Sequence, residues 1–258
     1  MNLFLRCLYA EYRKTKHLSH LRMIHILIPA GIAAVFLIYY QQVNGNTFMK
    51  MTGYFQVLGI GLPFLTGLFC SMTAQQEQSA GAFQNMLAVP FRPAVFYGKL
   101  GLFVLMGSLA VFAACLLFGV GWMLTANEPV APLLYENKMP AIIVCCLYAS
   151  GMISVGGLWL YIFHLYLSFR FAGQFSIILG VLESLGSAVL LTGLGDGIWM
   201  YLPCAWPSRL VSQYLAMQQN PKMPQADFFL ACMFCLCGNL LALLAFGIWS
   251  CRFEGRKT

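Results

Sequence analysis

Charged residues are scarce in this chain. Of its 258 residues only 9% are charged and 60% are hydrophobic, whereas about 25% of the residues in an ordinary soluble domain are charged. So few charges could not cover a water-exposed globule. The apolar residues also fall in blocks long enough to cross a hydrocarbon core about 30 Å thick as helices. We therefore expect one all-α, polytopic membrane domain over residues 1–258.

The sequence also lacks the motifs of several chemistries. It has no GxxxxGK[ST] phosphate-binding loop, so we do not expect the chain to bind ATP by itself. Its 4 histidines have no evident Ser or Asp constellation, and we expect no catalytic residue. The net charge of +7 comes from basic residues at the ends of apolar blocks. That pattern argues against nucleic acid as a partner.

The 10 cysteines do not predict a disulfide scaffold or a metal site, because nearly all of them lie inside apolar blocks. The run from Cys232 to Cys237 resembles a CxxC motif but continues an apolar block, with no loop to shape tetrahedral coordination. We expect buried free thiols and no zinc.

Six apolar blocks predict six transmembrane helices. The first begins at Met23 and has no clean small-residue cleavage site after it, so we expect it to be retained. Residues 1–22 are basic and place Leu5 and Tyr9 on one apolar face, which predicts an amphipathic helix at the membrane interface. The predicted spans are residues 23–40, 55–72, 100–124, 141–169, 175–194 and 228–251.

The distribution of basic residues predicts the orientation. Of 15 lysines and arginines, only Lys50, Lys138, Arg209 and Lys222 would lie outside if the N-terminus is cytoplasmic. By the positive-inside rule, both termini are then expected in the cytoplasm. The residues on the expected inner side are Arg6, Arg13, Lys14, Lys16, Arg22, Arg92, Lys99, Arg170, Arg252, Arg256 and Lys257.

Two connections are too long to be simple turns, and long connections often carry function. Residues 73–99 would be cytoplasmic, and they join a helix-compatible stretch to a proline-marked stop. Residues 195–227 would be extracellular, and their tryptophans, tyrosines and prolines suit short helices or a re-entrant turn at the interface. A polar cytoplasmic helix could dock on a soluble partner or be a plain solvated connector, and the residues alone leave both open.

At this point the sequence resembles a known family. The stretch EQSAGAFQNMLAVPFRPAVFYGK (residues 77–99), preceded by a basic amphipathic N-terminus, resembles the coupling-helix region of ABC-2 type transporter permeases. Two later stretches are similar to permeases of lantibiotic immunity ABC transporters. They are FRFAGQFSIILGVLESLGSAVLL (169–191) and YLPCAWPSRLV (201–211).

The resemblance implies a complex and a task. Two permease subunits, identical or sister chains, would pair with two copies of a separate ATPase that binds ATP and Mg. The complex would contact the lipid of the bacterial plasma membrane and expel from it a lantibiotic or related antimicrobial peptide. This would give self-immunity or resistance. Alternatives are an ABC-2 exporter of another drug or lipid, and a non-transport membrane enzyme or assembly factor. The implied ATPase-coupling residues are Glu77, Gly81, Phe83, Leu87, Pro90 and Arg92.

Glu183 departs from a plain apolar helix face. An intramembrane carboxylate costs roughly 2.5 to 3.5 kcal/mol on insertion scales, so we expect it to face a cavity or a partner. It could contact a cationic peptide, or form a buried hydrogen bond to Ser184, Ser187 or a neighbouring helix. Trp199 and Trp206 are further candidates for substrate contact or packing.

A patch of small residues in the fourth predicted span would let another helix approach closely. Packing within the chain and a subunit interface both remain possible. Pro29 and Pro63 lie inside the first two spans and predict bends. The patch consists of Ser150, Gly151, Ser154, Gly156 and Gly157.

Overall fold

The computed structural model describes residues 3–16, 19–43, 47–125, 138–220 and 225–255, and this part of the chain contains helices and no strand. Three 3-10 helices, η1 (Gly193–Gly195), η2 (Trp199–Tyr201) and η3 (Pro203–Ala205), lie between the seventh and eighth α-helices. The α-helices are α1 (Leu3–Lys16), α2 (Ser19–Gln42), α3 (Thr47–Ser79), α4 (Gln84–Leu87), α5 (Arg92–Thr125), α6 (Lys138–Arg170), α7 (Gly173–Leu190), α8 (Trp206–Gln219) and α9 (Ala226–Cys251).

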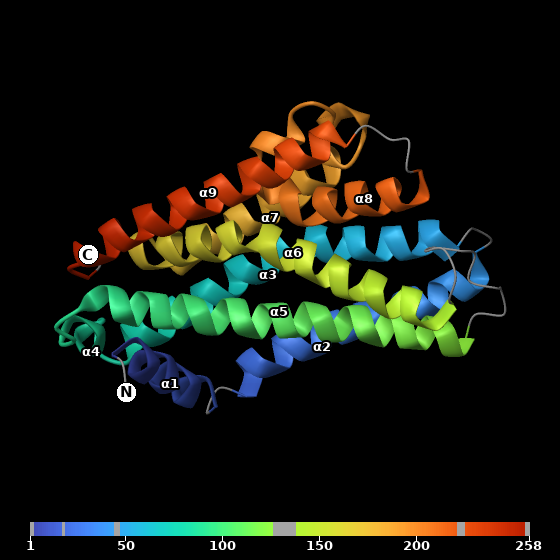
Figure 1. Ribbon diagram of the computed structural model, residues 1–258. Helices are drawn as coiled ribbons and strands as arrows, with labels where there is room; N and C mark the ends of the chain where they lie inside the picture. Colours follow the sequence, from blue (N-terminus) through green and yellow to red (C-terminus); the bar gives the residue numbers. More distant parts are fainter. Residues whose placement is uncertain (1–2, 17–18, 44–46, 126–137, 221–224, 256–258) are drawn as a thin grey trace.

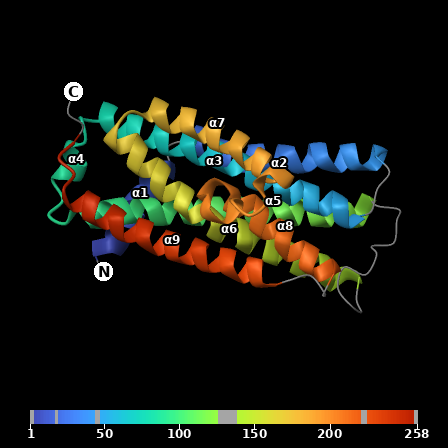
Figure 2. The same cartoon turned by 90° about the horizontal axis from the view of Figure 1, so that it is seen from above.

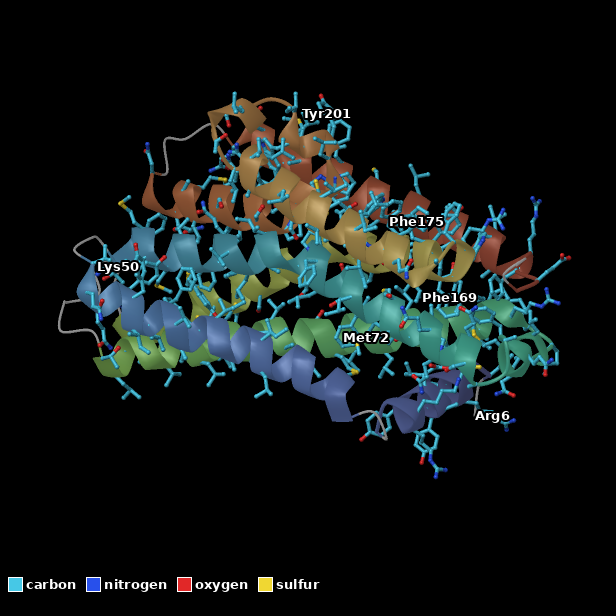
Figure 3. All side chains as sticks on the ribbon, turned by 180° about the vertical axis from the view of Figure 1, so that it is seen from behind. Arg6, Lys50, Met72, Phe169, Phe175 and Tyr201 are labelled. Atoms are coloured by element: carbon cyan, nitrogen blue, oxygen red, sulfur yellow. The ribbon has the colours of Figure 1, made fainter. Side chains whose placement is uncertain are left out.

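The long helices lie side by side in an elongated bundle (Figure 1). The two chain termini lie at the same end, together with α1 and α4, and we call this the terminal end. Seen from above, α6 runs between α7 and α9 (Figure 2), and it contacts both. Arg6 and Lys50 mark opposite ends of the bundle (Figure 3).

Among the described residues, five helices are long and apolar enough to cross a membrane: α3, α5, α7, α9 and the Ile142–Arg170 part of α6. They match five of the predicted spans. In α2 the apolar stretch among the residues whose side chains the structure describes is Leu27–Gln42, which covers only part of the predicted span 23–40. The sixth span therefore stays a prediction.

Several helix ends differ from the predicted limits. α3 continues to Ser79 and α5 begins at Arg92, so the connection predicted at 73–99 is reduced to residues 80–91. Gln and Glu favour helix, which lets α3 run past its apolar block. α7 stops at Leu190, four residues before the predicted limit.

Aromatic side chains form the centre of the bundle. Towards the far end, Tyr54 of α3 stacks on Phe118 of α5 with ring centroids 3.9 Å apart. At the terminal end, Phe96 of α5 lies edge-on to Phe169 of α6 and Phe253 beyond α9. Such edge-to-face and offset pairs add to the stabilisation from burial. The large apolar side chains on the outside suit contact with lipid.

α7 and α8 pack along α3 one after the other, so that together they cover it like one helix with an interruption. The hydroxyl of Ser187, near the end of α7, forms a hydrogen bond of 2.9 Å with the hydroxyl of Ser208 in α8. Both side chains are fully buried. Gln56 of α3 then donates to Ser212 at 3.0 Å. Residues 191–205, which we call the excursion, connect the end of α7 to the start of α8.

Candidate functional site

The connection between α3 and α5 turns sharply at its start. Gly81, Ala82 and Phe83 have φ values of 127°, 49° and 69°, and the first is in a region that glycine adopts without steric cost. The amide of Phe83 donates to the carbonyl of Glu77 at 3.2 Å. This turn reverses the chain just after α3 and starts the short helix α4.

One side of this connection faces inward. Phe83 is buried, with its ring 5.6 Å from that of Phe169 and 5.7 Å from that of Phe253. Met86 and Leu87 pack in the same apolar cluster. Arg92 donates to the carbonyl of Phe253 at 2.6 Å. These contacts fix the connection to the ends of α6 and α9.

The other side of the connection faces outward. Pro90 and Gly81 are exposed, and Phe91 is 56% exposed. Gln84, Asn85 and Ala88 are exposed as well. We call Gln84, Asn85, Ala88, Pro90 and Phe91 the connector surface.

A group of four charged side chains lies beside the connection, three of them buried and Lys14 partly exposed. Lys99 of α5 places its ammonium 2.6 Å from Glu77 of α3 and 2.5 Å from Glu11 of α1. Lys14 of α1 also contacts Glu77 at 2.7 Å and Glu11 at 2.9 Å. We call these residues the charge cluster. Two carboxylates face two ammonium groups, so the cluster is neutral overall.

The two carboxylates raise the pKa of Lys14. Partial burial of its ammonium acts in the opposite direction, but the charges and hydrogen bonds of Glu11 and Glu77 outweigh it. Lys99 is fully buried. Loss of one partner would therefore leave an unpaired charge inside the protein.

The charge cluster bears on the predicted roles of α1 and Glu77. α1 does not present its whole polar side to solvent, because Glu11 points into the bundle and Cys7 and Leu8 pack against Gly98 of α5. The interfacial position of α1 stays a prediction. Glu77 is only 6% exposed, so its carboxylate is not available for direct contact with a partner, and any coupling role would act through the cluster.

Glu183 has a partner that the sequence did not reveal. Its Oε2 lies 2.9 Å from Nε2 of His164 on α6. Nδ1 of the same imidazole lies 3.0 Å from the hydroxyl of Ser176 on α7, which in turn lies 3.1 Å from the carbonyl of Gly67 on α3. The expected alternative of a hydrogen bond to a neighbouring helix is thus present.

A signal for this arrangement does exist in the sequence. Ser176, Gly180, Glu183, Ser187 and Leu190 recur at spacings of three and four, which places them on one face of a helix. That face packs against α3: an added Cβ at Gly180 would lie 2.7 Å from the carbonyl oxygen of Pro63. The pattern reveals the buried face but not that His164 meets it.

The two candidate tryptophans are buried in packing. Trp206 donates its indole N–H to the carbonyl of Met200 at 2.9 Å, and its ring lies against Gly238 of α9. Trp199 lies beneath the guanidinium of Arg209 at 5.9 Å. Arg209 donates to the carbonyls of Leu190 and Thr192 at 2.5 and 2.7 Å and pairs with Asp196 at 2.9 Å. It thereby satisfies the carbonyl of Leu190 at the end of α7.

The small-residue patch of α6 packs largely within the chain. A Cβ added at Gly156 would lie 2.8 Å from the backbone nitrogen of Pro207, and one at Gly157 would lie 2.5 Å from Leu62. Gly151 faces open space. Intrachain packing accounts for the first two positions.

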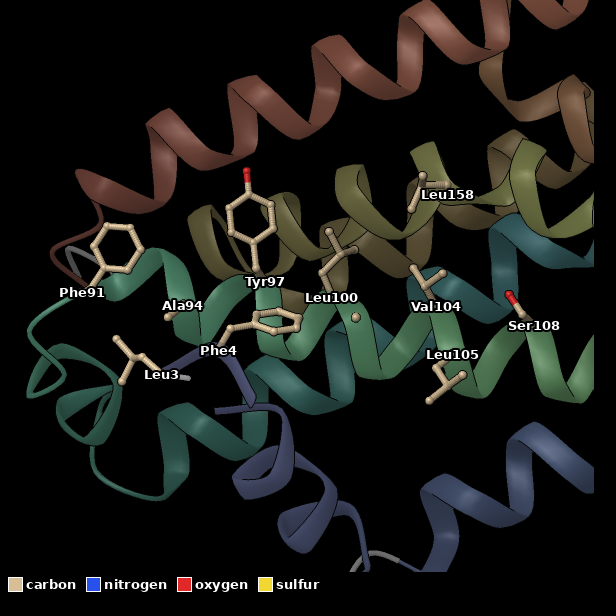
Figure 4. A pocket seen from close by; sticks show the side chains of 11 residues that line it. Leu3, Phe4, Phe91, Ala94, Tyr97, Leu100, Val104, Leu105, Ser108 and Leu158 are labelled. Carbon is tan, nitrogen blue, oxygen red and sulfur yellow. The ribbon is translucent and has the colours of Figure 1, made fainter. Parts of the chain in front are cut away.

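Two apolar hollows lie on the outside of the bundle. One, of about 730 Å³, follows α5 from Phe91 to Ser108 and is bordered by Leu3 and Phe4 of α1 (Figure 4). The other, of about 400 Å³, lies between α6 and α9.

Within the described residues, no group of three or more His, Cys, Asp or Glu side chains could hold a metal ion. All ten cysteines are free thiols.

Long apolar helices with exposed apolar side chains and paired internal charges define a multi-pass membrane protein. The chain belongs to the ABC-2 family of transporter proteins, whose family model matches residues 7–182. It is therefore a transporter membrane subunit. Comparison with curated proteins finds no match for this chain. The family match covers α3, the connection to α5, and the charge cluster.

Proposed function

We propose that this chain is the permease subunit of an ABC exporter that expels a lantibiotic or related antimicrobial peptide from the bacterial plasma membrane. A separate ATPase would supply ATP and Mg, and a second permease, identical or a sister chain, would complete the complex. The result would be self-immunity or resistance. The observation that carries the proposal is the family match together with an outward connector surface held rigidly from inside.

The connector surface suits a soluble partner. Its polar residues Gln84 and Asn85 form the first turn of α4, and Phe91 offers a large exposed apolar ring at the end of the connection. Phe83 and Arg92 anchor the opposite side to α6 and α9. A force on the connector surface would therefore reach the helices directly, because the connection has little freedom to yield.

The charges favour an orientation with the terminal end in the cytoplasm. Arg6 and Arg13 of α1, Arg92 of α5, Arg170 of α6 and Arg252 beyond α9 all lie at that end. Lys50 lies at the opposite end (Figure 3). By the positive-inside rule this distribution supports both termini and the connector surface on the cytoplasmic side, where an ATPase would meet them.

The peptide cargo rests on the resemblance of residues 169–191 and 201–211 to permeases of lantibiotic immunity transporters. These residues form α7 and the return of the excursion into α8. Glu183 adds a carboxylate that would suit a cationic peptide. Another drug or a lipid is the second candidate cargo, supported by the apolar hollow along α5.

Affinity purification of the tagged chain from its native membrane tests the proposal. We expect a nucleotide-binding ATPase in equal amount with the chain, and a second permease if pairing is heteromeric. The ATPase of the purified complex should then be stimulated by a lantibiotic. Purification without any ATPase contradicts the transporter proposal, and stimulation by lipid or drug but not by peptide contradicts the peptide cargo.

A further inference from the structure

The contacts of His164 restrict where protons can be. Nε2 and Glu183 Oε2 are 2.9 Å apart, so one hydrogen must lie between them, since two bare acceptors would repel. It belongs either to the imidazole or to a carboxylic acid. The Nδ1 side has the same requirement towards the Ser176 hydroxyl at 3.0 Å.

The carbonyl of Gly67 decides the Nδ1 side. A carbonyl only accepts, and it lies 3.1 Å from Ser176 Oγ, so the serine hydroxyl must donate to it if that bond is made. Nδ1 must then donate to Ser176. All three hydrogen bonds exist together only when Nδ1 carries a proton and a second proton lies between His164 and Glu183.

That proton count makes the His164–Glu183 pair neutral, either as imidazolium with carboxylate or as imidazole with carboxylic acid. Removal of one proton leaves a net negative charge and takes the Ser176 hydroxyl away from Gly67. His164 is fully buried, and both helices lie in candidate membrane spans. A net charge in such surroundings is costly unless another charge compensates it.

Few groups near the pair can supply that charge. From α3, the group that meets the site is the Gly67 carbonyl. From the excursion, the titratable group near Glu183 is the Cys204 thiol on η3. Within the described residues, Glu183 has no ion pair other than that with His164. The described residues hold no further cation at the pair, and a bound ligand would supply the compensating positive charge.

Glu183 gives access to such a charge. The side chain of Glu183 is 16% exposed, whereas that of His164 is fully buried. Glu183 lies one turn before Ser187, which shares a hydrogen bond with Ser208 of α8, and α7 ends three residues later at Leu190. Non-helical backbone at membrane depth is tolerated where it is buried in protein or lines a water-filled cavity.

We infer that the His164–Glu183 pair is a binding site for a cationic group, an ammonium or a guanidinium, which replaces one of the two protons held by the pair. The cation binds the Glu183 carboxylate, the remaining proton lies between Nε2 of His164 and Glu183, and the displaced proton is released to water. Charge balances, because one positive charge enters as one leaves. The inference deepens the proposed function by assigning an amphiphilic, positively charged cargo to this site.

The test uses the purified chain in phosphatidylcholine nanodiscs with dodecyltrimethylammonium, whose charge is fixed, below its micelle-forming concentration. We expect binding of the cation to release up to about one proton per chain. Because the cation then competes with that proton, its Kd should fall by up to about tenfold for each unit by which the pH is raised. Dodecanol, which has the same alkyl chain and no charge, should release none. Binding of the cation without proton release overturns the inference whatever the variants do.

Variants assign the effect to the pair. Glu183→Gln keeps shape and hydrogen bonding, and it should weaken binding of the cation about tenfold or more and abolish proton release. Glu254→Gln, the same change on an exposed acid at the terminal end, should match the wild type. His164→Gln still offers Glu183 a donor, so it should keep binding but move the pH at which protons are released. Unchanged binding by Glu183→Gln, or an unmoved pH profile for His164→Gln, contradicts the inference.

The same measurement is independent of the ATPase, because the chain is studied alone. If no ATPase co-purifies, the transporter proposal fails while a positive proton-release result stands. If the ATPase co-purifies but the cation binds without releasing protons, only the assignment of this site fails.

Discussion

The ammonium of Lys99 lies 2.6 Å from the carboxylate of Glu77, and both side chains are buried. The same ammonium reaches Glu11 of α1. One lysine thus joins the N-terminal helix to the last turns of α3, next to the connection that leads to α5. This joins α1 to both helices that the connection links.

Replacing Lys99 with methionine should detach α1. The change leaves Glu11 and Glu77 close together with Lys14 alone to balance them, and breaking a buried pair costs about 3 to 5 kcal/mol. We expect a lower thermal unfolding midpoint in detergent and faster alkylation of Cys7, which packs on Gly98. Arg13→Met, on the exposed side of α1, is the control. Equal midpoints for the two variants would contradict a structural role for Lys99.

Strong alkali should weaken the same contact through Lys14. The pKa of Lys14 is raised by Glu11 and Glu77 against the effect of burial, so its ion pairs are fully present below its ordinary value of 10.5. The stabilisation is lost as the pH rises through the higher pKa of the folded state. Lys14→Arg stays charged there. Its unfolding midpoint should therefore fall less than that of the wild type between pH 9 and pH 12, as scanning calorimetry can measure.

Substitution of two phenylalanines of the connection can distinguish an effect on ATPase docking from an effect on folding. Phe91→Ala removes an exposed ring, and we expect less ATPase in the purified complex with unchanged chain abundance. Phe83→Ala removes a ring buried against Phe169 and Phe253, which should destabilise the chain by about 3 to 5 kcal/mol. Immunoblots of both subunits in membranes and eluates give the two readouts. Normal ATPase recovery with Phe91→Ala would remove this ring from the docking surface.

Hydropathy was enough to predict an all-helical membrane chain and the position of five spanning helices. Apolar block length is a one-dimensional property that a sequence carries directly. It could not predict the end of α7 at Leu190, because Leu191 and Leu194 are equally apolar. At that end Arg209 of α8 donates to the carbonyls of Leu190 and Thr192, a tertiary contact that hydropathy does not reveal.

The pairings within the candidate sites were beyond the sequence for a different reason. Glu11 and Lys99, or His164 and Glu183, lie on separate helices, and their contact depends on how those helices are rotated and packed. The cost of an intramembrane carboxylate correctly required a partner for Glu183. It did not identify the partner, since any helix in the bundle could have supplied one.

The junction of α3 with α8 offers a prediction with a control on the same helix. An added Cβ at Gly59 would lie 2.6 Å from both the Cα and the nitrogen of Ser208, whereas one at Gly61 would meet nothing within 4 Å. Gly59→Ala must therefore push α8 away, and overpacking of this kind costs about 1 to 3 kcal/mol. Gly61→Ala should instead stabilise α3 by up to about 1 kcal/mol, because alanine favours helix over glycine.

Thermal unfolding of the two variants in the same detergent measures both effects, and opposite shifts of the midpoint are expected. Displacement of α8 would also separate Ser208 from Ser187, with which it now shares a hydrogen bond of 2.9 Å. The excursion would then lose one of its closing contacts, and residues 191–205 should be cleaved faster by protease in Gly59→Ala than in Gly61→Ala. Shifts of the same sign, or equal cleavage, would mean that α8 does not rest on α3 at Gly59.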